Sequence, residues 1–132
     1  MLLVDTNVLV DVLQDDPQWA NWSIGQLRAQ ASIHQLAINP IIYAEISLSF
    51  STLEGLDSAV STLTLELREI PRPALFLAAK AYAQYRKRGG SKLQVLPDFL
   101  IGAHAAVEGW PLLTRDASRF KTYFPTLEVI AP

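Results

Sequence analysis

Four acidic residues stand at positions from which a folded chain could bring their carboxylates together. Asp5 follows a short apolar run at the start of the chain, and Asp116 follows a similar run near its end. Asp98 comes directly after Pro97, at the expected start of a helix, and Glu45 lies at the edge of an apolar helical stripe. Carboxylates that meet can bind a metal ion or exchange protons with a substrate.

Each carboxylate by itself also has an ordinary structural explanation. Asp5 could cap the first helix, and Asp98 could complement the dipole of its own helix. Asp116 could be a turn residue, and Glu45 could pair with an arginine. The chemical interpretation therefore depends on the four groups meeting. The two apolar runs favour this for Asp5 and Asp116, because both runs should end at the same edge of a sheet.

Charge repulsion limits the form that such a cluster can take. Two unit charges about 5 Å apart repel each other by about 3 kcal/mol at an effective dielectric constant of 20. A cation or bound protons must offset this repulsion. A set of carboxylates without histidine or cysteine favours hard, oxygen-binding ions, so we expect Mg²⁺ or Mn²⁺. Such an ion can lower the pKa of water and polarise a phosphoryl oxygen.

The pattern around these acids predicts an α/β fold. Short apolar runs alternate with amphipathic helical segments, which is typical of a parallel sheet with helices on both faces. We predict a three-layer α/β/α architecture with a central, mainly parallel sheet of four to five short strands. The expected strands cover residues 1–4, 36–39, 67–70, 111–114 and 126–130. The expected helices cover about residues 8–13, 17–31, 40–50, 53–67, 73–88 and 97–108. Ligands of such sheets bind beyond the carboxyl ends of the strands.

The helix expected at residues 97–108 has small residues beside its acid. Gly102 and Ala105 lie four and seven positions after Asp98, on the same helical face. They would let this face approach the sheet closely and carry Asp98 inward. His104 is turned away from that face, so we expect it to have a structural role.

Composition narrows the class of protein. The chain has 132 residues, of which 50% are hydrophobic and 18% charged, so we expect one folded domain spanning residues 1–132. The absence of cysteine excludes disulfides, cysteine zinc sites, iron–sulfur clusters and thiol catalysis. No signal sequence is apparent, and no apolar run reaches the ~20 residues that span a bilayer. We expect a soluble, cytoplasmic protein with no membrane partner.

Basic residues near the ends of two expected elements are candidate RNA contacts. The net charge of −2 argues against a generally basic nucleic-acid-binding surface but leaves room for a local patch. Arg86, Lys87 and Arg88 end the fifth expected helix, and Lys92 follows shortly after. Arg115 stands directly beside one of the four acids. These side chains could contact phosphates, or they could complement a helix dipole and form a solvated face.

The order of these residues resembles that of the PIN-domain ribonucleases. The segment Leu-Val-Asp-Thr-Asn near the N-terminus and the segment Leu-Leu-Thr-Arg-Asp near the C-terminus carry the resemblance most specifically. Glu45 and Asp98 stand between them. The length of the chain is similar to that of the VapC-type toxins of type II toxin–antitoxin pairs, and the resemblance covers essentially the whole chain.

This resemblance implies a Mg²⁺- or Mn²⁺-dependent endoribonuclease that is usually a homodimer and is inhibited by a cognate antitoxin. Asp5 and Asp98 would be direct or water-mediated metal ligands. Glu45 and Asp116 would complete the acidic pocket as further metal and catalytic residues.

The resemblance also implies roles for two neutral side chains. Asn7 and Thr114 would orient the carboxylates. RNA would be hydrolysed to products with 5′-phosphate and 3′-hydroxyl ends.

Other functions stay open at this point. A Mg²⁺-dependent phosphatase of the haloacid-dehalogenase type would have an aspartate two residues after Asp5, where this chain has Asn7. A P-loop enzyme would need a glycine-rich loop that ends in Gly-Lys-Ser/Thr, which the sequence lacks. A non-catalytic RNA- or protein-binding module on the same fold predicts that the acids stay apart or that metal binds without turnover.

Overall fold

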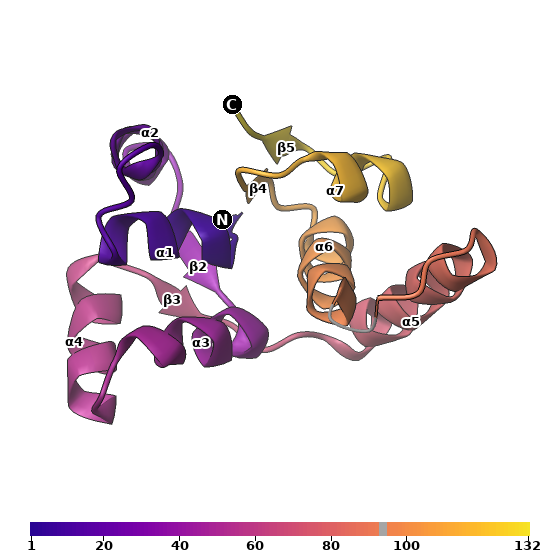
Figure 1. Cartoon of the computed structure of the whole chain (residues 1–132), viewed down its shortest axis with the longest axis horizontal. Coiled ribbons are helices and arrows are strands. Elements are labelled where there is room, and N and C mark those ends of the chain that lie inside the picture. The colour runs from indigo at the N-terminus through magenta and orange to yellow at the C-terminus, as the bar shows by residue number, and fades with distance from the viewer. Residues whose placement is uncertain (93–94) are drawn as a thin grey trace.

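The computed structural model describes residues 1–92 and 95–132 and contains one parallel β-sheet (Figure 1). The five strands run in the order β3-β2-β1-β4-β5, and every neighbouring pair is parallel. The strands are β1 (Leu2–Val4), β2 (Leu36–Ile38), β3 (Glu66–Leu67), β4 (Leu112–Leu113) and β5 (Val129–Ile130). The predicted α/β class and the predicted parallel sheet are confirmed.

Seven α-helices flank this sheet in the described residues, in two groups on either side of the strands (Figure 1). Right-handed crossovers place the helices between β1 and β3 on one face and those between β3 and β5 on the other. The helices are α1 (Thr6–Leu13), α2 (Ala20–Ala31), α3 (Pro40–Ile46), α4 (Leu53–Thr62), α5 (Arg72–Lys87), α6 (Leu96–Glu108) and α7 (Ser118–Tyr123). In the part of the chain that the structure describes, no helix is both long enough and apolar enough to cross a membrane.

The central strand β1 has both of its faces buried. Leu2, Leu3 and Val4 are completely inaccessible to solvent, as expected for a strand covered by helices on both sides. In the sheet register, Val4 lies opposite Leu113 of β4. Strands β1 and β4 therefore end side by side, and the residues that follow them lie at the carboxyl edge of the sheet.

Several element boundaries differ from the prediction. The helix expected at residues 53–67 ends at Thr62, because Thr64 adopts the left-handed conformation (φ 56°) and Leu65 N–H closes the turn on Val60 O. The third strand covers Glu66–Leu67 instead of residues 67–70. The second helix begins at Ala20 and not near residue 17, since the preceding residues form a turn on the Asp16 carboxylate.

Helix α7 was not predicted, and it changes the explanation for Gly102. A Cβ built on Gly102 would lie 2.5 Å from the ring of Phe124 and 2.9 Å from that of Phe120. The small residue in α6 thus makes room for the aromatic side chains of α7 and of the residue after it. The sequence analysis did not foresee these aromatic partners of Gly102, because α7 itself was not predicted.

We expect Gly102→Ala to destabilise the protein by about 1–3 kcal/mol, because the buried Phe120 and Phe124 rings would have to move. This loss should exceed the gain of about 1 kcal/mol that alanine brings to a helix interior. Gly25→Ala in α2 is the matched control, since nothing lies within 4 Å of its Cβ position. It should stabilise the protein by roughly 0.5–1 kcal/mol in chemical denaturation. Equal stability of the two variants would contradict this assignment.

Candidate active site

Asp5 caps helix α1 and lies at the centre of the carboxyl edge of the sheet. Its Oδ1 accepts a hydrogen bond from Thr6 N–H at 2.7 Å, and its Oδ2 accepts one from the Thr114 hydroxyl at 2.8 Å. Only 5% of the residue is exposed. Asp5 can therefore cap α1 and also belong to the acidic group, because its two carboxylate oxygens have different partners.

Glu45 reaches the same place from helix α3. The Thr6 hydroxyl donates to Glu45 Oε1 at 2.6 Å, which ties α3 to the start of α1. Asn39 fixes the start of α3 by accepting a hydrogen bond from Ile42 N–H at 3.0 Å. The role of Thr6 was missed in the sequence analysis, because a bond across 39 residues has no local signal.

Asn39 also joins α3 to α6. Its side-chain nitrogen lies 3.1 Å from His104 Nδ1, and both residues are fully buried. Burial lowers the pKa of His104, so the neutral imidazole is favoured. His104 thus makes a structural contact between the helices that present Glu45 and Asp98.

The Thr114 hydroxyl organises the loop after β4. It donates to Asp5 Oδ2 and accepts a hydrogen bond from Asp116 N–H at 3.1 Å. Asn7 approaches the same hydroxyl through its side-chain nitrogen at 3.3 Å, and its oxygen accepts from Arg115 N–H at 3.1 Å. Asn7 and Thr114 therefore position the Asp5 carboxylate and the loop that carries Asp116.

Asp98 and Asp116 complete the set from the other face of the sheet. Asp98 lies in the first turn of α6, and its Oδ2 is 2.5 Å from a guanidinium nitrogen of Arg119 on α7. The Asp116 Oδ1 accepts hydrogen bonds from the backbone N–H and the hydroxyl of Ser118, at 3.4 and 3.2 Å.

Electrostatics shows how closely the four acids act on one another. The pKa of Asp5 is raised from 3.8 to about 7, mainly by burial and to a smaller extent by the negative charges of Asp98 and Glu45. Hydrogen bonds from Thr114 and Thr6 to its carboxylate oppose this shift. The acids therefore lie near enough for mutual repulsion to influence their ionisation.

The pKa of Asp98 is also raised, first by burial. The Arg119 guanidinium lowers it, whereas the charges of Glu45 and Asp116 add to the increase. All four predicted acids thus belong to one electrostatic group at the carboxyl edge of the sheet, contributed by β1, α3, α6 and the loop after β4.

The donor set suits a hard divalent cation. Carboxylate oxygens are the ligands that Mg²⁺ and Mn²⁺ prefer, and a cation here would offset the repulsion that favours a proton on Asp5. Within residues 1–92 and 95–132, no three acidic or histidine side chains lie close enough to enclose an ion as they stand. Asp98 is paired with Arg119 instead. The residues fit a metal ion in their chemistry, and Asp5, Glu45, Asp98 and Asp116 are the ones that would hold it.

The predicted basic residues divide into two groups. Arg86, Lys87, Arg88 and Lys92 are exposed around the end of α5, as the sequence analysis expected. Only Arg88 among the arginines of this group contacts an aromatic ring, with its guanidinium 5.3 Å from the centre of Tyr123 in the described structure.

Arg115 is engaged inside the protein. Its Nε lies 2.8 Å from Asp11 Oδ2, and its guanidinium is 5.3 Å from the centre of the Trp19 ring. Asp11 is 1% exposed and also accepts a hydrogen bond from the Ser23 hydroxyl at 2.8 Å. Arg115 therefore anchors the loop after β4 to α1 and α2, and its contact with RNA stays a prediction.

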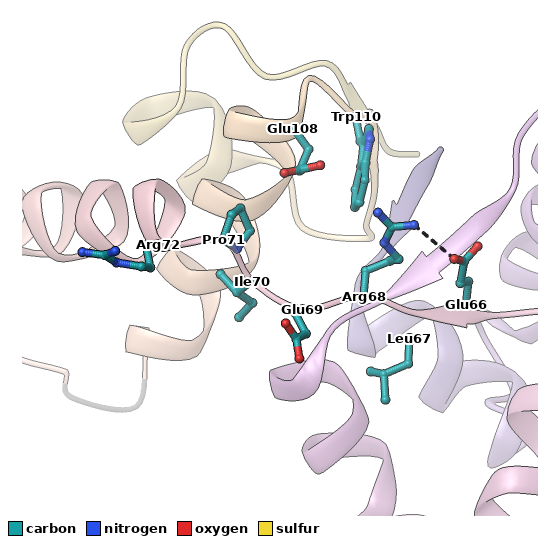
Figure 2. A pocket seen from close by; sticks show the side chains of 9 residues that line it. All are labelled: Glu66, Leu67, Arg68, Glu69, Ile70, Pro71, Arg72, Glu108 and Trp110. Carbon is teal, nitrogen blue, oxygen red and sulfur yellow. Dashed lines mark hydrogen bonds and ion pairs between the residues drawn. The ribbon is translucent and has the colours of Figure 1, made fainter.

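A cavity separate from the acidic group lies between the segment after β3 and the end of α6 (Figure 2). It has a volume of about 630 Å³, and Arg68 faces Trp110 across it, with the guanidinium 5.8 Å from the ring centre. None of the four acids lines it. Its lining residues are Glu66, Leu67, Arg68, Glu69, Ile70, Pro71, Arg72, Glu108 and Trp110. The acidic group therefore lies outside this cavity.

Comparison with known proteins places this geometry in a family. The family model for the PIN domain matches residues 2–124. The chain belongs to the PIN-domain family. The predicted resemblance is thereby confirmed. No curated protein sequence matches the chain significantly.

Several solved structures share this fold. VapBC2 from Rickettsia felis, bound to a DNA fragment from its promoter, has a TM-score of 0.75 and 21% identity, with 99% of this chain and 98% of that chain covered. A toxin–antitoxin complex from Klebsiella pneumoniae has a TM-score of 0.69 and 24% identity, covering 100% and 98%. FitAcB from Neisseria gonorrhoeae has a TM-score of 0.69 and 20% identity, covering 100% and 98%. At these identities the likeness shows a shared fold.

The raised pKa of Asp5 predicts how stability depends on pH in the absence of metal. Between its ordinary value of 3.8 and about 7, the folded protein holds a proton that the unfolded chain has lost. The Asp5 contribution to stability is therefore largest at low pH and falls as the pH rises towards 7.

We expect Asp5→Asn, which carries no such proton, to be more stable relative to wild type at pH 8 than at pH 5, by about 2–3 kcal/mol. Chemical denaturation in EDTA at both pH values measures this difference. Glu54→Gln, which neutralises an exposed acid on α4, is the control and should show no such change with pH. A parallel response of Asp5→Asn and wild type would show that Asp5 ionises normally.

Proposed function

We propose that this PIN-domain protein is a metal-dependent endoribonuclease that hydrolyses RNA phosphodiester bonds and acts in the cytoplasm as the toxin of a VapBC-type toxin–antitoxin pair. The observation that carries the proposal is the gathering of Asp5, Glu45, Asp98 and Asp116 at one edge of the sheet, where burial and neighbouring negative charge raise the pKa values of Asp5 and Asp98. Membership of the PIN family supplies the reaction class. The cofactor would be Mg²⁺ or Mn²⁺.

The side chains of the site would have different roles in the reaction. A divalent ion bound here would supply positive charge that lowers the pKa of water and offsets charge on the phosphoryl oxygens. Asp5 and Asp98 would hold the ion, with Thr114 keeping the Asp5 carboxylate in position. Glu45 has one oxygen fixed by the Thr6 hydroxyl, which leaves the other oxygen to accept the proton of the attacking water.

The bond changes follow from the proposed reaction class. The water oxygen forms a bond to phosphorus as the bond from phosphorus to the 3′ oxygen breaks in line with it. The strand after the break keeps a 5′-phosphate, and the strand before it gains a 3′-hydroxyl once a proton reaches the leaving oxygen. Asp116, positioned by Thr114 and Ser118, would complete the negative lining that holds the ion.

Asp98→Asn tests the assignment directly. We expect it to lower Mg²⁺- or Mn²⁺-dependent cleavage of single-stranded RNA at least about 100-fold, because an amide is a much poorer ligand for a hard cation. The fold should survive, since the carboxylate is partly exposed and its ion pair contributes little stability. Purified variants are incubated with RNA in metal or in EDTA, and the RNA ends are sequenced. Glu54→Gln makes the same change of charge on α4 and should cleave like wild type.

Three outcomes would contradict the endoribonuclease proposal. Equal cleavage by wild type and Asp5→Ala would assign the activity to a contaminant. RNA binding by wild type without metal-dependent cleavage would favour the alternative of a non-catalytic binding module. Release of inorganic phosphate from phosphomonoesters, without RNA cleavage, would favour a phosphatase-like enzyme.

We also propose that the protein is a homodimer whose activity a cognate antitoxin inhibits. One solved structure of the same fold is described as a toxin–antitoxin complex. This chain exposes large apolar side chains that a partner would cover, among them Phe76 at 66% and Leu67 at 50%.

The homodimer predicts twice the chain mass of 14.6 kDa in light scattering after size-exclusion chromatography. Burial of apolar surface between copies would stabilise this species, so the mass should persist at raised salt concentration. A mass of one chain at all micromolar concentrations would contradict the dimer and leave the nuclease proposal intact.

A further inference from the structure

Arg119 is the basic residue that pairs with the acidic group in the described structure. Its guanidinium nitrogen lies 2.5 Å from Asp98 Oδ2, whereas the other two ion pairs found there, Arg68–Glu66 and Arg115–Asp11, involve none of the four acids. The side chains of Arg119 and Asp98 are 30% and 37% exposed. Solvent and ions therefore reach this pair from outside.

A guanidinium and a divalent cation cannot use the same Asp98 oxygen together. An ion pair with this much exposure contributes little stability, so a small free energy suffices to open it. A divalent ion interacts with several carboxylates at once and carries twice the charge. The metal ion expected here would therefore displace Arg119 from Asp98.

The surroundings of Arg119 define where the displaced guanidinium can act. It lies 6.0 Å from the centre of the Tyr85 ring, and Tyr85 packs edge-on against Tyr123 with 6.3 Å between ring centres. The guanidinium of Arg88 lies over Tyr123 at 5.3 Å. Arg119, Tyr85, Tyr123 and Arg88 thus form a basic–aromatic strip that leads from the acidic site to the end of α5.

Such a strip suits a single RNA strand. Guanidinium groups form paired hydrogen bonds with phosphate oxygens, so Arg119 and Arg88 at the two ends of this strip suit an RNA backbone. A phosphate close to a bound ion would lie within reach of the residue that the ion displaces.

We propose that Arg119 is a displaceable internal cation, which holds Asp98 until a divalent ion binds and then contacts a backbone phosphate of the RNA strand. The inference rests on the proposed nuclease function and adds a coupling to it. Binding of the ion makes Arg119 available to RNA, and bound RNA keeps Arg119 away from Asp98. Each ligand therefore tightens the binding of the other through this residue.

Arg119→Gln tests separately the displacement of Arg119 by a divalent ion and the contact of Arg119 with an RNA phosphate. Because no ion pair has to open, we expect the variant to bind Mn²⁺ up to about 5-fold more tightly than wild type in calorimetry without RNA. In fluorescence anisotropy with a single-stranded RNA oligonucleotide, Ca²⁺ at constant ionic strength should tighten binding by wild type. Electrophoresis after each titration verifies that the oligonucleotide is intact. The variant should lose most of this tightening.

Two further variants control for charge and for shape. Arg28→Gln removes the same charge from an exposed position on α2 and should leave both measurements as in wild type. Arg119→Lys keeps the charge without the paired donors and should give intermediate values in both experiments. Thermal unfolding verifies that each variant is folded.

Unchanged or weaker Mn²⁺ binding by Arg119→Gln would overturn the displacement, and full retention of the Ca²⁺ effect on RNA binding would overturn the phosphate contact. In both cases metal-dependent RNA cleavage by wild type would leave the proposed nuclease function standing. If wild type bound neither Mn²⁺ nor RNA, the proposed function and the inference would fail together.

Discussion

Repulsion between carboxylates at one end of a parallel sheet is the constraint on which the rest of the site depends. Asp5 is almost fully buried, and its pKa rises to about 7 because burial and neighbouring negative charge disfavour ionisation. Folding gathers these groups at a cost in stability. A surface selected for stability alone would not place four acids together, and this supports the proposal that the site binds a cation.

The fold meets this constraint by building rigid support around each carboxylate. Thr114 and Thr6 each bridge two of the site's segments through a hydroxyl, and Asn7 braces the loop after β4. Asn39 and His104 join the helices that carry Glu45 and Asp98. Neutral donors can hold carboxylates in position without neutralising them, which keeps the negative charge available for a bound ion.

Much of the fold follows from local patterns. Continuous apolar runs reveal the strands, because both faces of β1 are buried and alternation with polar residues is absent. Pro97 predicts the start of α6 to within one residue. The six-residue helix α7 escapes such reasoning, since it is shorter than two turns and depends on packing of Phe120 and Phe124 against α6.

The amino-acid sequence was enough to infer the identities and order of the four acids. It also placed Asp5 and Asp116 at the carboxyl edge of the sheet, because parallel strands end on the same side. The hydrogen-bond and ion-pair partners of those acids could not be inferred from the sequence. Arg119 pairs with Asp98 across 21 residues, and Arg115 pairs with the buried Asp11 while 30% of its own side chain stays exposed. Periodicity describes positions along one element, whereas a side chain's partner depends on how separate elements pack, and only the folded structure contains that information.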